Sequence, residues 1–428
     1  MLFAAVVVAS APLAARADAV LDWNSVLLAA IRLTRPLPPV AARDMAMMNT
    51  AIYDSVNAAS ALRYRPYRYD GPRILGASAE AAATAAAYRV LSRLFPEVPA
   101  RAPGLAARMQ ALYERAAGDA TSPAIAAGIA LGARQADTIL AARASDGADA
   151  VKPPYRGVAT PGRWRPTPPA LLPGALLQWP QVTPWAMAVP TQFRPPAPPP
   201  MTSAIWAGSM NMAQALGSAA SAVRGPDRTE IALFWADQDG TETPPGHWLD
   251  IAMSVAAERG LDLLQNARLL ALVSVTEADA GIVAWDAKYA YGAWRPITAI
   301  AEAASSGNPE VTPEPGWTPL LTTPPFPEYV SAHSTFSSAA ATALRLFFAD
   351  DQVAFTARTD AAGLYGVTRR FTSFSSAAEE AGMSRVYGGI HFHFSHMAGN
   401  VAGRRLGEYV FDNYFQSGAG IAATVTTH

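Results

Sequence analysis

The chemistry of this chain must come from a small set of side chains, because it contains six histidines and no cysteine. Without cysteine there is no thiol nucleophile, no thiolate metal site and no disulfide framework. Four of the six histidines fall between His333 and His396. Histidine, lysine, arginine, serine and carboxylates remain as the reactive groups, and we expect them to act in the C-terminal half.

Two cations precede the histidine-rich region, in the segment WDAKYAYGAWRP. Lys288 and Arg295 are seven residues apart, close to two helical turns. This spacing predicts that both project from one face near the C-terminal end of a long apolar helix, and Trp285 shares that face. A solvated basic edge at a helix end would explain an isolated pair of cations. The aromatic residues around this pair instead favour partly buried cations that face a ligand.

The segment PPFPEYVSAHS, residues 324–334, predicts a helix N-terminus. Its three prolines exclude a helix before Tyr329, so Ser331 to Ser334 begin the helix that follows. The free backbone N–H groups of a first helical turn form an anion site. Ser331 or Ser334 could serve only as the N-cap. That interpretation does not explain why His333 stands in the same turn.

A third segment, SRVYGGIHFHFSH, combines an arginine with three histidines. Arg385 and His391 are six residues apart and would point to different sides of one continuous helix. The pair Gly388 and Gly389 permits a break in the helix, because glycine adopts backbone angles that other residues avoid. Such a break could turn both side chains toward a common centre.

His391, His393 and His396 also fit a metal site when they are taken alone. This alternative weakens when the segments are combined, because a cavity that holds Lys288, Arg295 and Arg385 would repel a divalent cation. The same cavity would attract a tetrahedral oxyanion. Asp237 and Asp239 are candidate carboxylate partners for a site arginine, and a solvated loop pair explains them equally well.

Helical periodicity dominates the elements that must position these groups. The expected fold is all-α, with packed helix bundles that form two four-helix-bundle-like halves. The periodic segments are 20–33, 40–61, 77–95, 124–142, 206–223, 260–289, 334–348 and 397–415. Fifteen of the 36 prolines lie within residues 151–200, which excludes helix there and predicts a long extended connection. Its aromatic residues favour a course along the helical surface.

The expected organisation has four parts. They are a signal peptide at residues 1–17, an N-terminal helical half at 18–150, the Pro-rich connecting segment at 151–200, and a C-terminal helical half at 201–428 that carries the site. An apolar run followed by the small-residue pattern Ala15-Arg16-Ala17 predicts the signal and hence a secreted or periplasmic protein. No later stretch approaches 18 apolar residues, so no transmembrane segment is expected.

The charge balance argues against polyanionic partners. The chain has 33 Lys+Arg and 34 Asp+Glu residues, a formal net charge of -1. Such a balance gives no long-range field that would attract a nucleic-acid backbone or an anionic membrane surface. We therefore expect small-molecule substrates and no nucleic-acid partner.

The motifs Lys-x6-Arg-Pro, Ser-x-His and Ser-Arg-x5-His, in this order, resemble the superfamily of vanadium-dependent haloperoxidases and type-2 phosphatidic acid phosphatases. The similarity is closest to the soluble, secreted chloroperoxidase-like branch and covers roughly the C-terminal half, from about Arg228 to His391. Three motifs in a fixed order make the resemblance specific. It implies vanadate as the cofactor, or phosphate at the same site in a phosphatase.

The resemblance implies a role for each residue that matches a motif. The equatorial oxygens of vanadate or phosphate are then bound by Lys288, Arg295, Ser331, the backbone N–H of Ala332, and Arg385. His391 takes the apical position, either as the vanadium ligand of a haloperoxidase or as the nucleophile that forms a phosphohistidine in a phosphatase. His333 acts as general acid and base. Trp285 and Phe326 match aromatic positions that line the halide pocket.

Four positions depart from the family pattern. Ala332 stands where the family has glycine, although its backbone N–H is retained. Ser395 stands where the family has an aspartate that orients the apical histidine, which predicts that His391 is a weaker ligand and nucleophile than usual. His393 replaces a frequent arginine, and His396 is additional. Either of these two histidines is a candidate to compensate for the missing carboxylate.

Three functions follow from the resemblance and its departures. The first is a secreted vanadium-dependent haloperoxidase-like enzyme of the peroxidase class, which uses hydrogen peroxide to oxidise halide at bound vanadate. The second is a secreted acid phosphatase that cleaves phosphate esters through a phosphohistidine. The third is a non-catalytic phosphate- or vanadate-binding homologue, suggested by Ser395 and Ala332.

Overall fold

The computed structural model describes residues 18–60, 62–118 and 121–418. Helices dominate this part of the chain, so the all-α prediction is confirmed. The first helices are α1 (Ala19–Thr34), α2 (Pro38–Ala59), α3 (Ala79–Leu94), α4 (Val98–Arg101), α5 (Pro103–Ala117) and α6 (Pro123–Arg143). They are followed by η1 (Trp179–Gln181), α7 (Ala204–Gly217), α8 (Pro226–Phe234), α9 (Thr243–Glu258), α10 (Leu263–Tyr291), α11 (Pro296–Ala301), η2 (Ala303–Ser306), α12 (Ala332–Phe348), α13 (Phe374–Tyr387) and α14 (His393–Asn413).

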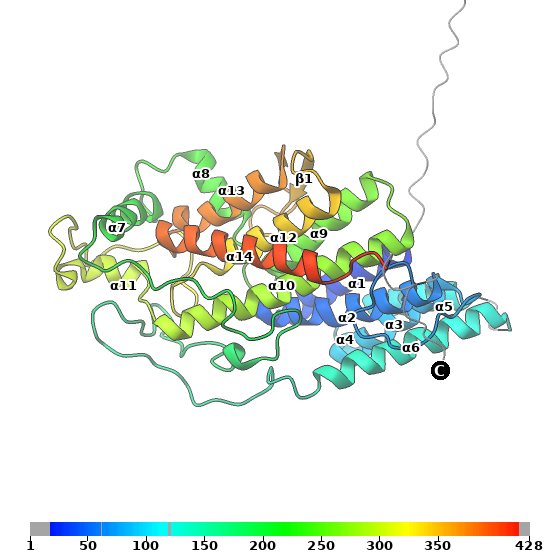
Figure 1. The fold of residues 1–428 in the computed structure, drawn as a ribbon. Coiled ribbons are helices and arrows are strands. Elements are labelled where there is room, and N and C mark those ends of the chain that lie inside the picture. Colours follow the sequence, from blue (N-terminus) through cyan, green and yellow to red (C-terminus); the bar gives the residue numbers. More distant parts are fainter. Residues whose placement is uncertain (1–17, 61, 119–120, 419–428) are drawn as a thin grey trace, which may run out of the picture.

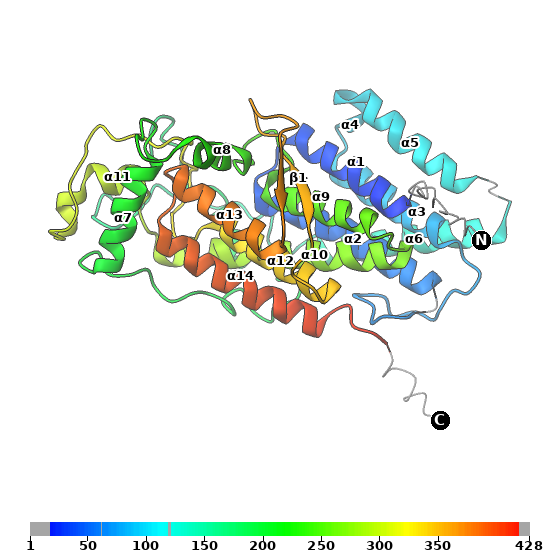
Figure 2. The same cartoon turned by 90° about the horizontal axis from the view of Figure 1, so that it is seen from above.

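Helix α10 connects two groups of packed helices (Figures 1 and 2). Its sequence is apolar on nearly all sides, which is typical of a helix surrounded by protein, and most of its residues are buried. On one side α10 packs against α2, which in turn packs against α3 and α6. On the other side it packs against α12, the partner of α13 and α14. One continuous hydrophobic core includes residues of both groups, so α10 holds the molecule together.

The Pro-rich segment 151–200 contains the short 3-10 helix η1 and no α-helix, as the proline count predicts. Its aromatic residues Trp164, Trp179 and Trp185 are buried. The segment therefore lies against the helices, as the sequence indicated. Buried Asp279 of α10 anchors it, because the carboxylate accepts the backbone N–H groups of Trp185, Ala186 and Met187 at 2.7–2.9 Å.

The long helix α10 ends earlier than the spacing of its cations suggests. The prediction that Lys288 and Arg295 share one helix is wrong. Gly292 adopts a left-handed conformation with φ 57° and ends the helix, as glycine commonly does. Arg295 then forms the N-cap of the short helix α11, in front of Pro296. The chain turns between the two cations, and this turn brings Arg295 onto the site from a different direction.

Several other elements differ from the periodic segments. Helix α7 ends at Gly217, whereas periodicity extended it to Val223. Helices α5, α8, α9 and α13 were not predicted. The first three begin with proline in their first turn, which reads as a helix breaker in a sequence scan but is tolerated there. A small antiparallel sheet of β1 (Phe355–Arg358) and β2 (Thr368–Phe371) was also missed, because four-residue strands carry little alternation.

No helix within the described ranges is both long and apolar enough to cross a membrane. The predicted signal peptide, residues 1–17, lies outside the described residues.

Candidate active site

Lys288 lies near the C-terminal end of α10 and is completely buried. Its Nζ donates to three backbone carbonyls of the loop before α12, those of Pro327 at 3.2 Å, Glu328 at 3.0 Å and Val330 at 2.5 Å. All three ammonium hydrogens are therefore used to hold this loop. In this arrangement Lys288 contributes its positive charge to the site rather than a free hydrogen-bond donor.

Arg295, from the first sequence segment, contacts residues of the other two segments. Its Nε donates to the carbonyl of Phe326 at 2.8 Å, and its Nη1 donates to the carbonyl of Ile390 at 2.8 Å. Nη1 also lies 3.2 Å from His391 Nε2. The remaining nitrogen, Nη2, is buried and has no hydrogen-bond partner among the described residues. A buried guanidinium donor without a partner indicates a missing acceptor.

Helix α12 begins as predicted, with Ser331 as its N-cap. The Ser331 hydroxyl accepts from the backbone N–H of Ser334 at 3.4 Å. Ala332 and His333 are the first two helical residues, and their N–H groups have no acceptor within the helix. The N-terminus of α12 thus presents free donors and the positive end of a helix dipole to the same region as Arg295.

The helix ends at the Gly388-Gly389 pair, between Arg385 and His391, as predicted. Helix α13 ends at Tyr387, and Gly389 has φ 74°, a conformation that favours glycine. The backbone N–H of His391 returns to the carbonyl of Arg385 at 3.3 Å. This tight turn brings both side chains to the lining of one cavity, whereas a continuous helix would have separated them.

Arg385 is held by the carbonyls of Trp235 and Ala236, at 3.2 and 3.4 Å from its Nη1. Its Nε is buried and lacks a partner among the described residues. Asp237, which follows these two carbonyls, provides a nearby negative charge that opposes the effect of burial on Arg385. The sequence-based suggestion that Asp237 pairs with a site arginine is supported as a charge interaction, and no direct ion pair joins the two residues in the described chain.

A carboxylate contacts His391 after all. Glu328 Oε1 lies 2.7 Å from His391 Nδ1 and accepts the backbone N–H of Phe392 at 3.0 Å. The expectation that Ser395 leaves His391 without a carboxylate partner is therefore wrong. The Ser395 hydroxyl is buried, and no hydrogen bond joins it to His391 in the described part of the chain. Sequence reasoning overlooked Glu328 because its only signal was a charged residue among prolines and aromatics.

The contacts of His391 define which of its nitrogens carries hydrogen. An arginine can only donate, so Nε2 must accept from Arg295 Nη1. Nδ1 then carries the hydrogen and donates it to Glu328. Burial, reinforced by Arg295, Lys288 and Arg385, holds the pKa of His391 well below its usual 6.5. The ring is neutral at pH 7, with the lone pair of Nε2 on the side of Arg295.

His333 faces the same cavity from the first turn of α12. Its Nε2 lies 3.1 Å from the carbonyl of Trp235, which fixes the hydrogen on Nε2 and leaves Nδ1 as the free base. Burial, aided by Arg385, keeps the pKa of His333 well below 6.5. Asp237 Oδ2 lies 3.9 Å from Nε2.

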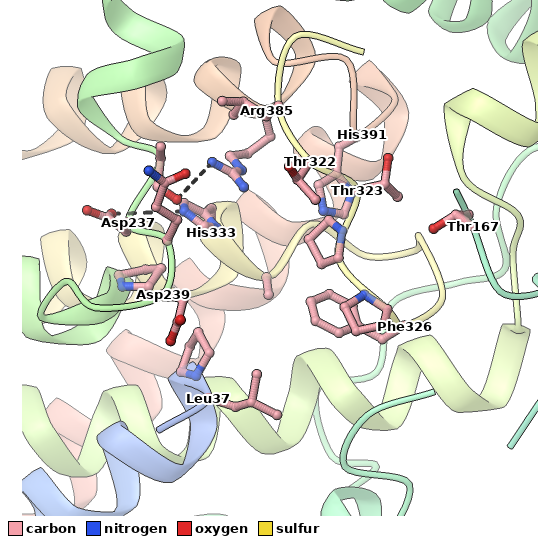
Figure 3. A pocket seen from close by; sticks show the side chains of 18 of the residues that line it. Leu37, Thr167, Asp237, Asp239, Thr322, Thr323, Phe326, His333, Arg385 and His391 are labelled. Atoms are coloured by element: carbon pink, nitrogen blue, oxygen red, sulfur yellow. Dashed lines mark hydrogen bonds and ion pairs between the residues drawn. The ribbon is translucent and has the colours of Figure 1, made fainter. Parts of the chain in front are cut away.

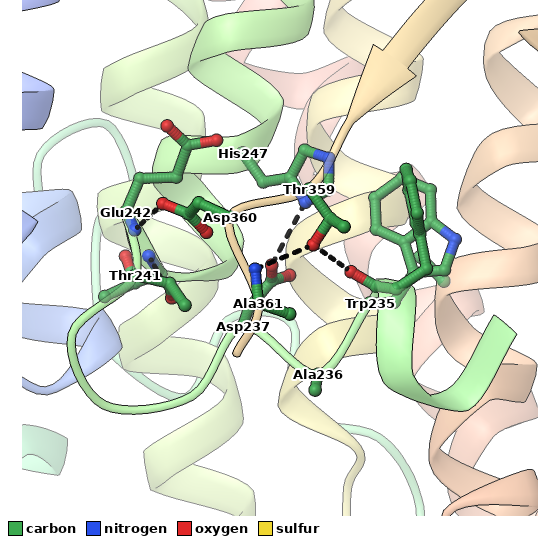
Figure 4. Close-up of polar contacts among 12 residues, drawn as sticks. Trp235, Ala236, Asp237, Thr241, Glu242, His247, Thr359, Asp360 and Ala361 are labelled. Carbon is green, nitrogen blue, oxygen red and sulfur yellow. Dashed lines mark hydrogen bonds and ion pairs between the residues drawn. The ribbon is translucent and has the colours of Figure 1, made fainter. Parts of the chain in front are cut away.

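Another buried histidine, His247, forms a hydrogen bond with Asp237. His247 Nδ1 lies 3.1 Å from Asp237 Oδ1, and its ring stacks on Trp235 at 4.5 Å between centroids (Figure 4). Burial alone would lower the pKa of His247, but the Asp237 carboxylate raises it to about 9. No motif in the sequence pointed to His247, which lies far from the three motifs. Its positive charge fixes the carboxylate that stands beside both His333 and Arg385.

Burial makes the charged forms of the site's cations less favourable, which lowers their pKa values. Burial, with the neighbouring Arg295 and Arg385, holds the pKa of Lys288 well below its usual 10.5. Burial lowers the pKa of Arg295 to about 9 and that of Arg385 to about 10. Burial also raises the pKa of Glu328 to about 7, against the opposing effect of the Phe392 amide and the cations. The three buried cations outnumber the two carboxylates near them, Glu328 and Asp237, and an oxyanion would neutralise the excess positive charge.

A cavity of about 450 Å³ reaches Arg385 directly, whereas Lys288, Arg295 and Ser331 are not among its lining residues. Arg385, His333 and His391 lie around it, with Phe326 nearby (Figure 3). Most of the remaining lining is apolar and comes from the Pro-rich segment and the loop before α12. Trp285 and Phe326 both line the cavity, with ring centroids 4.9 Å apart. The centroid of Phe326 also lies 5.1 Å from Lys288 Nζ, so these rings adjoin the cations.

The structure therefore gathers most of the residues that the motifs singled out, and it leaves two histidines elsewhere. His396 is buried against Ser334 and Glu379, and His393 is half-buried beside it, with ring centroids 5.8 Å apart. Neither contacts His391. Because the three histidines have different partners, they do not form the common metal site that was considered as an alternative.

Residues 268–418 match a family model described as the VCPO second helical-bundle domain. A stretch of 162 residues is 33% identical to vanadium chloroperoxidase of Curvularia inaequalis, which covers 33% of this chain and 25% of that relative. The crystal structure of a bacterial vanadium-dependent iodoperoxidase is similar over 92% of this chain and 96% of its own, with a TM-score of 0.79 and 28% identity.

The fold is shared more widely. A bacterial vanadium-dependent chloroperoxidase in its holo form has a TM-score of 0.67 with 16% identity, over 88% of this chain and 93% of its own. In this chain the all-α fold surrounds a buried cluster of cations and two histidines with lowered pKa values. The chain is therefore similar to vanadium-dependent haloperoxidases, in sequence over residues 268–418 and in fold over most of its length.

Proposed function

We propose that this protein is a haloperoxidase that oxidises halide with hydrogen peroxide at a bound vanadate. One observation carries the proposal: three buried cations converge on the N-terminus of α12, and two of their guanidinium nitrogens, Arg295 Nη2 and Arg385 Nε, lack an acceptor in the described chain. A tetrahedral oxyanion fits such a set of donors, because it offers acceptors in several directions and neutralises the excess charge.

The residues present fit vanadate. Its oxygens would be held by Arg295, Arg385, Ser331 and the backbone N–H of Ala332, and Lys288 would supply charge. Substitution of glycine by Ala332 keeps the N–H. When bound, vanadate supplies the centre at which peroxide is activated for the oxidation of halide.

The two histidines have complementary tasks in this proposal. His391 Nε2 would hold the vanadium in place of the hydrogen bond that it accepts from Arg295, and Glu328 holds the opposite nitrogen in its hydrogen-bearing form. His333 is neutral and has a free Nδ1 toward the cavity side, so it can accept a proton from incoming peroxide and return it later. Trp285 and Phe326 form the apolar wall beside the cations and would exclude water from the halide.

An acid phosphatase activity is the second candidate, and one contact favours it. A neutral His391 whose Nδ1 hydrogen is held by a carboxylate is also what a nucleophile that forms a phosphohistidine needs. The same contact removes the main argument for a non-catalytic homologue, which was the absence of a carboxylate near His391. Phosphate esters are thus the alternative substrates of the same site.

Activity assays separate the candidates. The purified protein, loaded with orthovanadate, is expected to oxidise iodide or bromide when hydrogen peroxide is added, and to lose this activity on removal of vanadate. Hydrolysis of p-nitrophenyl phosphate without halide oxidation would reject the haloperoxidase in favour of the phosphatase. Binding of vanadate without either reaction would reject both enzymes.

The location and organisation of the chain remain parts of this proposal. The apolar run and the small-residue pattern at residues 1–17 support export to the periplasm or the exterior. The four-part division, with the site carried by residues 201–428, is supported by the positions of the site residues. Mass spectrometry of the N-terminus after expression in a secreting host tests cleavage near Ala17.

A further inference from the structure

A buried chain of hydrogen bonds leads from the Ser331 hydroxyl to the surface of α13. Ser334 Oγ donates to Ser331 Oγ at 2.9 Å. Ser334 Oγ also lies 3.0 Å from His396 Nδ1. His396 Nε2 lies 3.1 Å from Glu379 Oε1. Ser331, Ser334 and His396 are fully buried, whereas the Glu379 side chain is 56% exposed. This series of hydrogen bonds therefore runs from the proposed oxyanion site to solvent.

The direction of each hydrogen bond in this chain is fixed by counting hydrogens. A hydroxyl has one hydrogen, and that of Ser334 goes to Ser331. His396 Nδ1 must therefore carry a hydrogen and donate it to Ser334. Glu379 is an acceptor when it is ionised, so Nε2 carries a hydrogen as well. Asn400 Nδ2 lies 3.3 Å from Nε2 but can only donate, so it donates to Glu379 Oε2 instead. A doubly protonated His396 paired with Glu379 satisfies both contacts.

These hydrogen-bond directions determine whether the Ser331 hydroxyl can donate its hydrogen at the proposed oxyanion site. Ser331 Oγ accepts both the hydroxyl and the backbone N–H of Ser334, at 2.9 and 3.4 Å. Its own hydrogen is then free for another acceptor. If the hydrogen bonds had the opposite direction, with Ser334 donating to His396, Ser331 would have to donate to Ser334. Its hydrogen would no longer be available to a ligand.

The packing around His396 supports a fixed arrangement. A Cβ placed on Gly382 of α13 would lie 2.2 Å from His396 Nδ1 and 3.0 Å from Ser334 Oγ. A Cβ on Gly399 of α14 would lie 2.7 Å from the carbonyl of Ser331. Two glycines thus permit α13 and α14 to approach α12 closely at this point. Asn400 holds the outer end, since its Nδ2 donates to Glu379 Oε2 at 3.0 Å.

We propose that the Glu379–His396 pair is a positioning device, which acts through Ser334 and fixes the Ser331 hydroxyl as a hydrogen-bond donor toward the oxyanion. The inference rests on the oxyanion binding in the proposed function. His396 and Glu379 do not touch the ligand themselves. They determine the direction of the hydrogen bonds that end at it.

A double-mutant cycle tests the proposal, with orthovanadate and inorganic phosphate as the probes and calorimetric titration as the measurement. Ser331→Ala and His396→Leu should each weaken vanadate binding about 10-fold, the usual effect of one hydrogen bond to a charged group. The double variant should bind no more weakly than either single variant, because both changes remove the same donor. His396→Asn, which can place an N–H near the position of Nδ1, should recover most of the affinity.

Matched controls separate a positioning role from a structural one. Ser337 lies on the same helix and is also buried, and its Oγ accepts from Trp248 Nε1 at 2.8 Å instead of joining the hydrogen bonds to Ser331. Ser337→Ala should therefore leave the vanadate affinity unchanged. If His396→Leu does not fold, Ser334→Ala replaces it in the cycle with the smallest possible change.

Three results would overturn the proposal. The first is normal vanadate affinity in folded His396→Leu protein. The second is a double variant about 100-fold weaker than the wild type, which would show that the two residues act independently. The third is an imidazole ¹⁵N chemical shift that identifies His396 Nδ1 as lacking hydrogen. Wild-type protein that binds neither oxyanion would reject the proposed function itself, and this inference with it, whereas the three results leave the proposed function standing.

Discussion

Glu328 Oε1 accepts a hydrogen bond from His391 Nδ1 at 2.7 Å, although 63 residues separate the two in the sequence. The loop that carries Glu328 is fixed to α10 by Lys288, whose Nζ donates to the carbonyl of Glu328 itself. The loop before α12 thereby carries the carboxylate that contacts the histidine and accepts all three hydrogen bonds of Lys288. The family places this carboxylate four residues after the histidine, where this chain has Ser395.

Replacing Glu328 by glutamine should impair turnover more than folding. Glu328→Gln keeps an acceptor oxygen for His391 Nδ1 but removes the charge that strengthens the opposite nitrogen. We expect a loss of about 10- to 100-fold in activity or vanadate affinity, the usual effect of a partner that orients a metal ligand. Steady-state halide oxidation and vanadate titration measure it, and thermal unfolding checks the fold.

A second substitution makes this test specific. Adding Ser395→Asp to Glu328→Gln restores a carboxylate at the position that the family uses, and it should recover part of the lost activity. Glu328→Gln protein with full activity would show that His391 needs no carboxylate. Absence of any recovery in the double variant would mean that Asp at position 395 cannot reach the ring.

Removal of Arg385 should separate ligand binding from stability. Its guanidinium makes two long hydrogen bonds to carbonyls and leaves Nε free, so Arg385→Met removes a ligand donor and little internal bonding. We expect vanadate affinity to fall about 10- to 100-fold. The exposed Arg228 provides the control, since Arg228→Met changes the net charge equally and should leave affinity unaltered. Equal losses in both variants would refute a local role.

Oxyanion affinity should decrease as the pH rises. In the free protein the pKa of Lys288 is well below 10.5 and that of Arg295 is about 9. A bound anion favours the charged forms and raises both pKa values, so binding takes up protons and weakens as the pH rises through them. Tungstate is a suitable probe, because it stays a tetrahedral dianion over this range. Calorimetry in buffers of different ionisation enthalpy measures the uptake, and affinity without pH dependence would contradict the prediction.

His333 should matter for turnover and not for binding. It lies beside the cavity with a free Nδ1, and its Nε2 is bound to the Trp235 carbonyl. His333→Gln is expected to reduce halide oxidation about 100-fold or more, the usual contribution of a general acid or base. Vanadate affinity should stay within about threefold of the wild type, since the ring is neutral. A parallel loss of affinity would assign His333 to ligand binding instead.

The close contact of α12 with α14 should be sensitive to one methyl group. A Cβ on Gly403 would lie 2.3 Å from the carbonyl of Thr335, a backbone atom that cannot move aside. Gly403→Ala should therefore lower the free energy of unfolding by about 1–3 kcal/mol. Gly208 of α7 is exposed, and a Cβ there meets nothing within 4 Å. Gly208→Ala should raise stability by about 0.5–1 kcal/mol, and denaturant unfolding compares the two.

The local features of this protein were readable from the sequence because they depend on neighbouring residues. Apolar periodicity predicted helices α1, α2, α3, α6, α7, α10, α12 and α14, the prolines predicted the extended segment, and Gly388-Gly389 predicted the turn between Arg385 and His391. The start of α12 at Ser331 also followed from short-range rules of capping and proline geometry. Motif order then indicated which side chains belong to one site.

The tertiary structure decided what depends on residues far apart in the chain. Arg295 reaches the site only because Gly292 ends α10 and the chain turns, which periodicity cannot show. Glu328 reaches His391 because a loop held by Lys288 lies against the turn after α13. The function of an ionisable side chain depends on its partners and its burial, and neither is encoded in the spacing of nearby residues. The sequence by itself determined the helices and the chemical groups, and packing determined which carboxylate serves which histidine.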